Sequence, residues 1–359
     1  MSDQPAPTKT ISDFEATLNK ADTSVVAFEE DDKTFVHWVR GFLRGNPTAI
    51  PATLLIVSVL IFGAIAQNFL NASTLSLVLK QVTVIGIIAI AQTMIILTAG
   101  IDLSVGAILV LCMIVMGKLS VDSGVPTGIA IAIAMAVGTA MGALNGALVT
   151  YVRLPPFIVT LGTLSIFTAL KLWYSHSESV RPADIEEKAP FLNWFGQTFD
   201  LGGAQVTYGG IAMIALAVLA WYMLNRTPWG KHVQAVGDDP DSASLAGIQV
   251  SRVLVSVYAF AGLICGFCAW VAIGRVGSVS PIAFETANLD SITATVIGGT
   301  SLFGGRASIA GSVLGALIVG VFSTGLSLAR VDDYWQTGTT GVLVIVAVAI
   351  DQWLRRATQ

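Results

Sequence analysis

The feature that most constrains this chain is a series of apolar stretches, each nearly as long as a membrane is thick. A helix needs about 20 apolar residues to cross the hydrocarbon core of a bilayer. Of the 359 residues, 54% are apolar and 12% are charged, whereas a soluble domain carries roughly 25% charged residues. The sequence therefore predicts an all-α polytopic membrane protein and excludes a water-soluble fold. The clear spans are 49–67, 82–98, 127–149, 155–174, 208–224, 253–273, 309–328 and 339–354.

Two weaker segments, 106–119 and 291–303, raise the expected number of transmembrane helices to about ten. At 1.5 Å per residue each spans only about 20 Å, which is too little to cross alone. Both adjoin glycine-rich breaks, AGIDLSVG at 99–106 and GGTSLFGG at 298–305. If the two segments are re-entrant, eight full spans remain; alternatively, the glycines only permit close helix packing.

The ten segments divide into two halves of five. Because five is odd, the second half starts on the opposite side of the membrane from the first. The weak segments 106–119 and 291–303 then occupy the third position of each half. Short or broken helices at matching positions are typical of inverted-repeat transporters. We therefore expect two inverted halves in which the third and eighth helices are short or broken.

Basic residues gather in alternate connections, which predicts cytosolic amino and carboxyl termini by the positive-inside rule. Loop 225–252 then lies in the cytosol. Loop 175–207 lies outside, where its acidic and aromatic residues either dock a soluble partner or are only solvated. Residues 1–33 are polar and acidic and predict a disordered cytosolic tail. Residues 34–48 form either an amphipathic helix on the membrane surface or a basic flank to the first span.

Several classes of function are excluded by what the sequence lacks. A net charge of −4 without basic clusters excludes a nucleic-acid binder. No G-x-x-x-x-G-K-[ST] motif occurs, so we do not expect this chain to hydrolyse ATP itself. Neither a catalytic triad nor a metal-ligand spacing is visible, and we expect no catalytic residue, metal or cofactor in this chain. Cys112, Cys265 and Cys268 lie in apolar runs and are interpreted as packing residues.

The predicted spans contain almost no charged residues, which fits a neutral substrate better than a charged one. A neutral substrate would need hydroxyl and amide groups along its path. Asp102 is the nearest exception, and it either caps the helix that follows or takes part in gating or transport. Gly138, Gly142 and Gly146 recur at every fourth residue and predict a smooth stripe for helix packing. Each hydroxyl or amide residue in the spans either lines such a path or only packs and bonds to the backbone of its own helix. The candidate pathway residues are Gln92, Thr93, Asp102, Ser104, Asn145, Thr160, Thr163, Ser165, Thr293, Thr295 and Thr300.

Loop 225–252 contains a pattern for a short helix. An Asp-Pro-Asp sequence can start a helix with the proline near its first position, and a glycine can end it. The segment is either a structured loop or a lever that a separate motor protein contacts. Its residues are Asp239, Pro240, Asp241, Ser242, Ala243, Leu245 and Gly247.

Residues 241–247 resemble the E-A-A-x-x-x-G coupling loop of ATP-binding-cassette importer permeases. They depart from it by Asp241 for Glu and Ser242 for Ala, and no I-x-L-P follows. Over residues 45–356 the chain is similar to bacterial monosaccharide permeases of the ribose, fructose, xylose and arabinose type. The segments that carry this resemblance are AGIDLSVGAILVL (99–111), PPFIVTLGTLSIFTAL (155–170), AVGDDPDSASLAGIQV (235–250) and VIGGTSLFGGRASIAGSVLGALIVGV (296–321).

The resemblance implies the permease subunit of a type II ATP-driven importer in the bacterial inner membrane. It further implies a second permease copy in a homodimer, an ATP-binding subunit and a periplasmic sugar-binding protein. The implied substrate is a monosaccharide of the fructose or ribose class, translocated by alternating access. Related permeases carry branched-chain amino acids or nucleosides, and a self-sufficient secondary sugar transporter is the remaining alternative.

Overall fold

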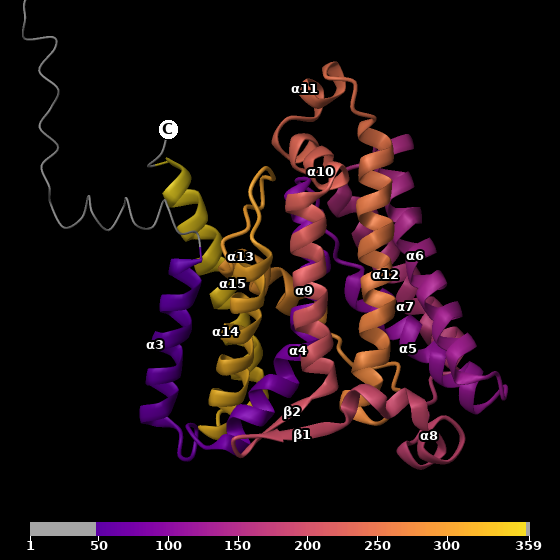
Figure 1. Ribbon diagram of the computed structural model, residues 1–359, viewed down its shortest axis with the longest axis vertical. Helices are drawn as coiled ribbons and strands as arrows, with labels where there is room; N and C mark the ends of the chain where they lie inside the picture. The colour runs from indigo at the N-terminus through magenta and orange to yellow at the C-terminus, as the bar shows by residue number, and fades with distance from the viewer. Residues whose placement is uncertain (1–47, 357–359) are drawn as a thin grey trace, which may run out of the picture. The chain divides into compact units, whose positions relative to one another are not determined.

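The computed structural model describes residues 48–356 (Figure 1). Six helices in this range are long and apolar enough to cross a membrane: α4, α6, α7, α9, α12 and α14. The expected tail over 1–33 and surface helix over 34–48 lie outside the described residues, apart from Thr48. The apolar helices are α3 (Ala49–Ile65), α4 (Ala72–Leu97), α5 (Val105–Val121), α6 (Thr127–Tyr151), α7 (Pro156–Ser175), α9 (Tyr208–Arg226), α12 (Val250–Val276), α13 (Ala287–Ile297), α14 (Ile309–Leu328) and α15 (Asp333–Arg356).

Short elements cover the two ends of this bundle. At one end lie α8 (Pro182–Lys188), the 3-10 helix η2 (Pro190–Gly196) and the strands β1 (Thr198–Leu201) and β2 (Ala204–Thr207). At the opposite end lie α10 (Pro228–Asp238) and α11 (Pro240–Leu245) (Figure 1). Loops 175–207 and 225–252 therefore lie at opposite ends, as the alternation of spans requires.

The hairpin of β1 and β2 was not expected from the sequence. The strands are antiparallel, with Thr198 opposite Thr207 and Leu201 opposite Ala204. Gly202 and Gly203 form the turn with φ of 61° and 89°, values that a two-residue hairpin turn favours and that glycine adopts without a Cβ penalty. The Gly-Gly pair was thus the available sequence signal for this hairpin.

The helix contacts of one half are repeated in the other. α6 packs on α12 as α14 packs on α4, and α5 packs on α12 as α13 packs on α4. In addition, α5 contacts α6 and α7, just as α13 contacts α14 and α15. α3 ends, and α9 begins, at the end of the bundle where β1 and β2 lie (Figure 1). The two halves therefore run in opposite directions, which agrees with the inverted topology expected from the sequence.

Glycine allows the close contact between α6 and α12. A Cβ added to Gly138 would lie 2.6 Å from the carbonyl oxygen of Gly262, and one added to Gly266 would lie 2.9 Å from the Cα of Met135. A Cβ added to Gly142 would meet the carbonyl oxygen of Tyr258, and one added to Gly146 would lie 2.8 Å from the Cα of Val255. Backbones this close leave no room for a side chain, so glycine is required along this interface.

Several helix boundaries differ from the expected spans. α4 begins at Ala72 instead of 82 because polar side chains in its first turns bond within the protein: Ser76 Oγ accepts from the N–H of Gln205 at 2.7 Å, and Gln81 accepts from Arg275. The segment expected over 106–119 is longer, at 17 residues (α5).

The bounds predicted for the helix over 291–303 are wrong at both ends. α13 covers Ala287–Ile297, and residues 298–308 form a loop. Gly298 packs against the backbone of Gly311, and Gly299 has a φ of 86°, which is incompatible with helix continuation. At 11 residues α13 spans only about 16 Å, so it does not cross a bilayer alone.

Candidate functional site

A cluster of fully buried polar side chains surrounds the break between α4 and α5. We call Gln92, Asp102, Ser104, Asn145 and Thr160 the Asp102 cluster; each is at most 1% exposed. They come from α4, the 98–104 loop, α6 and α7. All of them were pathway candidates from the sequence alone.

Asp102 is the centre of this cluster. Its Oδ1 accepts hydrogen bonds from the N–H and the hydroxyl of Ser104, both at 2.7 Å, and its Oδ2 accepts from Asn145 Nδ2 at 3.3 Å. Asn145 Nδ2 also donates to Ser104 Oγ at 2.8 Å. α5 begins at Val105 with Ser104 as its N-cap residue, so Asp102 does not occupy the cap position itself. It holds the start of α5 from two residues upstream.

The backbone of the 98–104 loop is held from both sides. The side-chain amide of Gln92 is oriented so that its nitrogen and its oxygen both form hydrogen bonds. The nitrogen donates to the carbonyl oxygen of Asp102 and the oxygen accepts from the N–H of Asp102, both at 3.3 Å. Thr160 donates to the carbonyl oxygen of Ile101 at 3.0 Å. Ala99 takes a φ of 58° as the chain leaves α4. Buried polar groups thus replace the hydrogen bonds that the broken helix does not make.

Two buried polar atoms near Asp102 have no hydrogen-bond partner within residues 48–356. They are Asn145 Oδ1 and the hydroxyl of Tyr258 on α12. The Tyr258 hydroxyl would lie 2.6 Å from a Cβ added to Gly100, which places it against the 98–104 loop. Tyr258 was not among the residues predicted from the sequence, although a tyrosine inside an apolar span was an available signal. The cluster therefore keeps unused hydrogen-bonding capacity in this conformation.

A second buried cluster lies on the neighbouring face of α4. We call Thr93, Thr295, Thr300 and Ser312 the Ser312 cluster. Thr93 Oγ1 donates to Ser312 Oγ at 2.7 Å, and the oxygens of Thr300 and Ser312 are 3.4 Å apart. Thr295 donates across to the carbonyl oxygen of Ala89 at 3.2 Å and within α13 to that of Ser291 at 2.7 Å. α4 therefore lies between the two clusters, with consecutive residues, Gln92 and Thr93, in one cluster each.

The remaining pathway candidates make no hydrogen bond between side chains to either cluster. Thr293 donates to the carbonyl oxygen of Leu289 in its own helix at 2.7 Å, and Thr163 is 3.4 Å from that of Thr160. Ser165 is exposed. Ser312, by contrast, was not among the predicted pathway residues, because a serine in a glycine-rich span is usually interpreted as a packing residue.

The segment expected as a short cytosolic helix is helical. α11 starts at Pro240, and Asp239 caps it by accepting from the N–H groups of Asp241 and Ser242 at 3.0 and 3.2 Å. The hydroxyl of Ser242 donates to Asp239 Oδ2 at 2.5 Å; this bond, with those from the N–H groups, lowers the pKa of Asp239. Gly247 has a φ of 84° just after the helix, as expected for a glycine C-cap.

α11 presents one large apolar side chain to solvent. Leu245 is 90% exposed, while Ala243 is buried against the rest of the protein. Beside it, a hollow of about 380 Å³ is lined by α10, the 246–249 turn and α12, with His232 and Arg252 on its wall. α10 was not predicted from the sequence, although Thr227 followed by Pro228 is a usual helix start. In the structure Thr227 Oγ1 accepts a hydrogen bond from the N–H of Gly230 at 3.2 Å.

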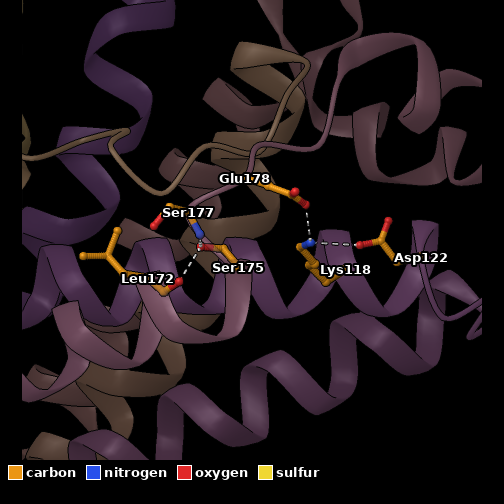
Figure 2. Close-up of polar contacts among 6 residues, drawn as sticks. All are labelled: Lys118, Asp122, Leu172, Ser175, Ser177 and Glu178. Atoms are coloured by element: carbon orange, nitrogen blue, oxygen red, sulfur yellow. Dashed lines mark hydrogen bonds and ion pairs between the residues drawn. The ribbon is translucent and has the colours of Figure 1, made fainter.

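At the opposite end, the base of the 175–207 loop is tied to α5. Figure 2 shows Lys118 Nζ between the carboxylates of Asp122, at 3.1 Å, and Glu178, at 3.6 Å. The hydroxyl of Ser175 donates to the carbonyl oxygen of Leu172 at 3.3 Å and accepts from the N–H of Ser177 at 3.1 Å (Figure 2). The side chains of Asp122 and Glu178 are 49% and 73% exposed, so these ion pairs fix the position of the loop base and add little to the stability of the fold.

Comparisons with known proteins agree with this architecture. A family model described as "Branched-chain amino acid transport system / permease component" matches residues 74–348. The fructose import permease protein FrcC of Rhizobium meliloti is 48% identical over 345 residues, 96% of this chain and 96% of that protein. The ribose import permease protein RbsC of Bacillus subtilis is 37% identical over 298 residues, covering 83% of this chain and 90% of that protein.

The D-allose transport system permease protein AlsC of Escherichia coli is 34% identical over 304 residues, covering 84% of this chain and 91% of that protein. No solved structure matches the chain at a significant level. The family match runs from α4 into α15 and so includes both polar clusters and α11. The chain therefore belongs to this family of membrane-spanning transport permeases.

Proposed function

We propose that this permease is the membrane-spanning subunit of an ATP-driven importer for a monosaccharide, with fructose the first candidate and ribose the second. The observation that carries the proposal is 48% identity over 96% of the chain to a protein named as a fructose import permease. A sugar is neutral and presents hydroxyl groups. The two polar clusters offer hydroxyl and amide groups and a single carboxylate, which is the chemistry that a neutral polyhydroxyl substrate needs.

The proposed path runs beside the two breaks, between α4 and α5 and between α13 and α14. Non-helical backbone at membrane depth is tolerated only where protein or a water-filled cavity covers it. Both clusters are fully buried here, which is what a closed state of the proposed path would require. In alternating access the same hydroxyls and amides would separate from one another and face the sugar.

The proposed partners follow from the two ends of the bundle. α11, with its exposed Leu245, would dock in a groove of an ATP-binding subunit, which holds ATP and Mg. A periplasmic sugar-binding protein would dock at the end formed by α8, η2 and the β hairpin. A second copy of this chain would complete a homodimer in the bacterial inner membrane, with both termini in the cytosol.

Amino acids are the alternative class of substrate, because the family description names branched-chain amino acid transport. A free amino acid carries an ammonium and a carboxylate, and a buried charge needs a partner of opposite sign. The two clusters supply Asp102 and no basic side chain among the described residues. This favours a neutral substrate.

Deletion of this chain is expected to abolish uptake of radiolabelled fructose in its native cell, and its re-expression to restore uptake. Unlabelled ribose should compete if the substrate range is broad, and leucine should not. Uptake should follow the ATP level and persist when an uncoupler collapses the proton gradient while ATP is maintained. Uptake that stops with the gradient would favour the secondary transporter, and competition by leucine would favour an amino acid permease.

The proposed orientation predicts opposite labelling of two exposed serines. A Ser177→Cys variant should react in intact cells with a thiol reagent that does not cross the inner membrane, whereas a Ser244→Cys variant should react only after lysis. The unmodified protein serves as the control, because Cys112, Cys265 and Cys268 are all 0% exposed. Reversed labelling would mean that α11 faces outward and cannot meet an ATPase.

A further inference from the structure

Three backbone segments that are far apart in the sequence meet beside α10 without any side chain between them. They are the end of α10 at Gly237, the end of α4 at Leu97, and Gly304 with Gly305 in the 298–308 loop. The N–H of Gly305 donates to the carbonyl oxygen of Leu97 at 3.1 Å. We call these four residues the glycine junction.

Each glycine of the junction is needed for contact. A Cβ added to Gly237 would collide with the carbonyl group of Leu97 and would lie 3.0 Å from its carbonyl carbon. One added to Gly304 would lie 2.6 Å from the carbonyl oxygen of Gly237, and one added to Gly305 would lie 3.1 Å from Asp238 Oδ1. Gly304 and Gly305 also have φ of 82° and 75°, which L-residues with a Cβ rarely adopt.

Each segment leads directly to a part of the molecule that the proposed function uses. Gly237 is followed by Asp238 and then by Asp239, the residue that caps α11. Leu97 is followed by the 98–104 loop, which holds Asp102. Gly304 and Gly305 lie in the loop that holds Thr300 of the Ser312 cluster. One point of contact therefore joins the end of α10 to both breaks.

We propose that the glycine junction transmits the movement of α11 to the two broken segments as one rigid unit, a proposal that rests on the proposed ATP-driven function. Backbone atoms in van der Waals contact and a direct N–H to carbonyl bond leave no flexible side chain to absorb a displacement. When the ATP-binding subunit moves α11, the ends of α4 and of the 298–308 loop move with it. The Asp102 and Ser312 clusters are thereby rearranged together.

The first test separates the segments with a single methyl group. Gly237→Ala should reduce ATP-dependent uptake at least tenfold while the assembled transporter keeps its ATPase activity within twofold, which is the signature of uncoupling. Gly162→Ala is the matched control, because a Cβ at that helical glycine meets nothing within 4 Å. Normal uptake in Gly237→Ala would overturn the proposal. If the chain did not drive ATP-dependent transport at all, the unmodified protein and the control would fail as well.

The second test leaves the junction intact and remains decisive if Gly237→Ala does not assemble. Spin labels are placed at Ser244→Cys on α11 and Arg306→Cys next to the junction, both at exposed positions. Trapping ATP hydrolysis should leave the distance between these two labels unchanged. The distance from Ser244→Cys to a label at Ser177→Cys, at the opposite end, should change. A change in the first distance, or no change in the second, would overturn the rigid transmission.

Discussion

Replacing Leu245 with Asp is expected to weaken the association of this permease with its ATP-binding subunit at least about tenfold and to reduce uptake accordingly. Burying a leucine side chain stabilises an interface by roughly 1.5–3 kcal/mol, and an aspartate in an apolar groove adds the cost of removing its charge from water. Leu245 is 90% exposed in the permease alone. Its substitution should therefore leave the free energy of unfolding of the permease nearly unchanged. Co-purification with the tagged ATP-binding subunit measures the association.

Leu201→Asp is the control for this prediction. Leu201 is 65% exposed in β1 at the opposite end of the bundle (Figure 1), so its substitution adds the same charge away from the proposed interface. The control should co-purify with the ATP-binding subunit as the unmodified permease does. If Leu245→Asp also co-purifies normally and transports at the usual rate, α11 is a connector and the ATPase docks elsewhere.

The course of the chain through the bundle was predictable because apolar length is a local property. Each expected span corresponds to an apolar helix, and the short helix after Asp239 begins at Pro240 as the Asp-Pro-Asp pattern indicated. Boundaries were less predictable where tertiary contacts satisfy polar residues. The first turns of α4 contain Lys80 and Gln81, which suggest a connection when hydropathy alone is considered, yet Gln81 accepts a hydrogen bond from Arg275 on α12.

Membership of the polar clusters was only partly predictable. Hydroxyls and amides inside apolar spans identified Gln92, Asn145 and Thr160, because such groups need partners when buried. Which groups meet depends on how helices pack, and no local pattern carries that information. Thr93 and Ser312 are 219 residues apart in sequence, yet their hydroxyl oxygens are only 2.7 Å apart in the structure. For the same reason the glycine spacing in 298–305 indicated a break but could not reveal that Gly305 meets Leu97.

The position of Asp102 predicts that its two simplest substitutions have very different effects. In Asp102→Ala the N–H of Ser104 and a donor of Asn145 lose their acceptor inside the protein. Each buried unpaired group costs roughly 1–3 kcal/mol, so the variant should unfold at a lower temperature and lose at least about tenfold in uptake, a factor equivalent to 1.4 kcal/mol. Thermal unfolding of the purified permease and sugar uptake in cells are the two measurements.

Asp102→Asn should retain the fold and keep uptake within about threefold of the unmodified permease, which corresponds to less than 1 kcal/mol. The substituted amide keeps one oxygen toward the N–H of Ser104. The amide nitrogen of the new asparagine would replace Oδ2 and face Asn145. The Oδ1 of Asn145 has no partner within residues 48–356. If the Asn145 amide rotates by half a turn, this oxygen would accept a hydrogen bond from the new nitrogen. An equal loss of uptake in both variants, with Asp102→Asn still stably folded, would contradict this interpretation. The negative charge itself would then be required for transport, whereas a loss confined to Asp102→Ala would mean that Asp102 acts by holding the 98–104 loop in place.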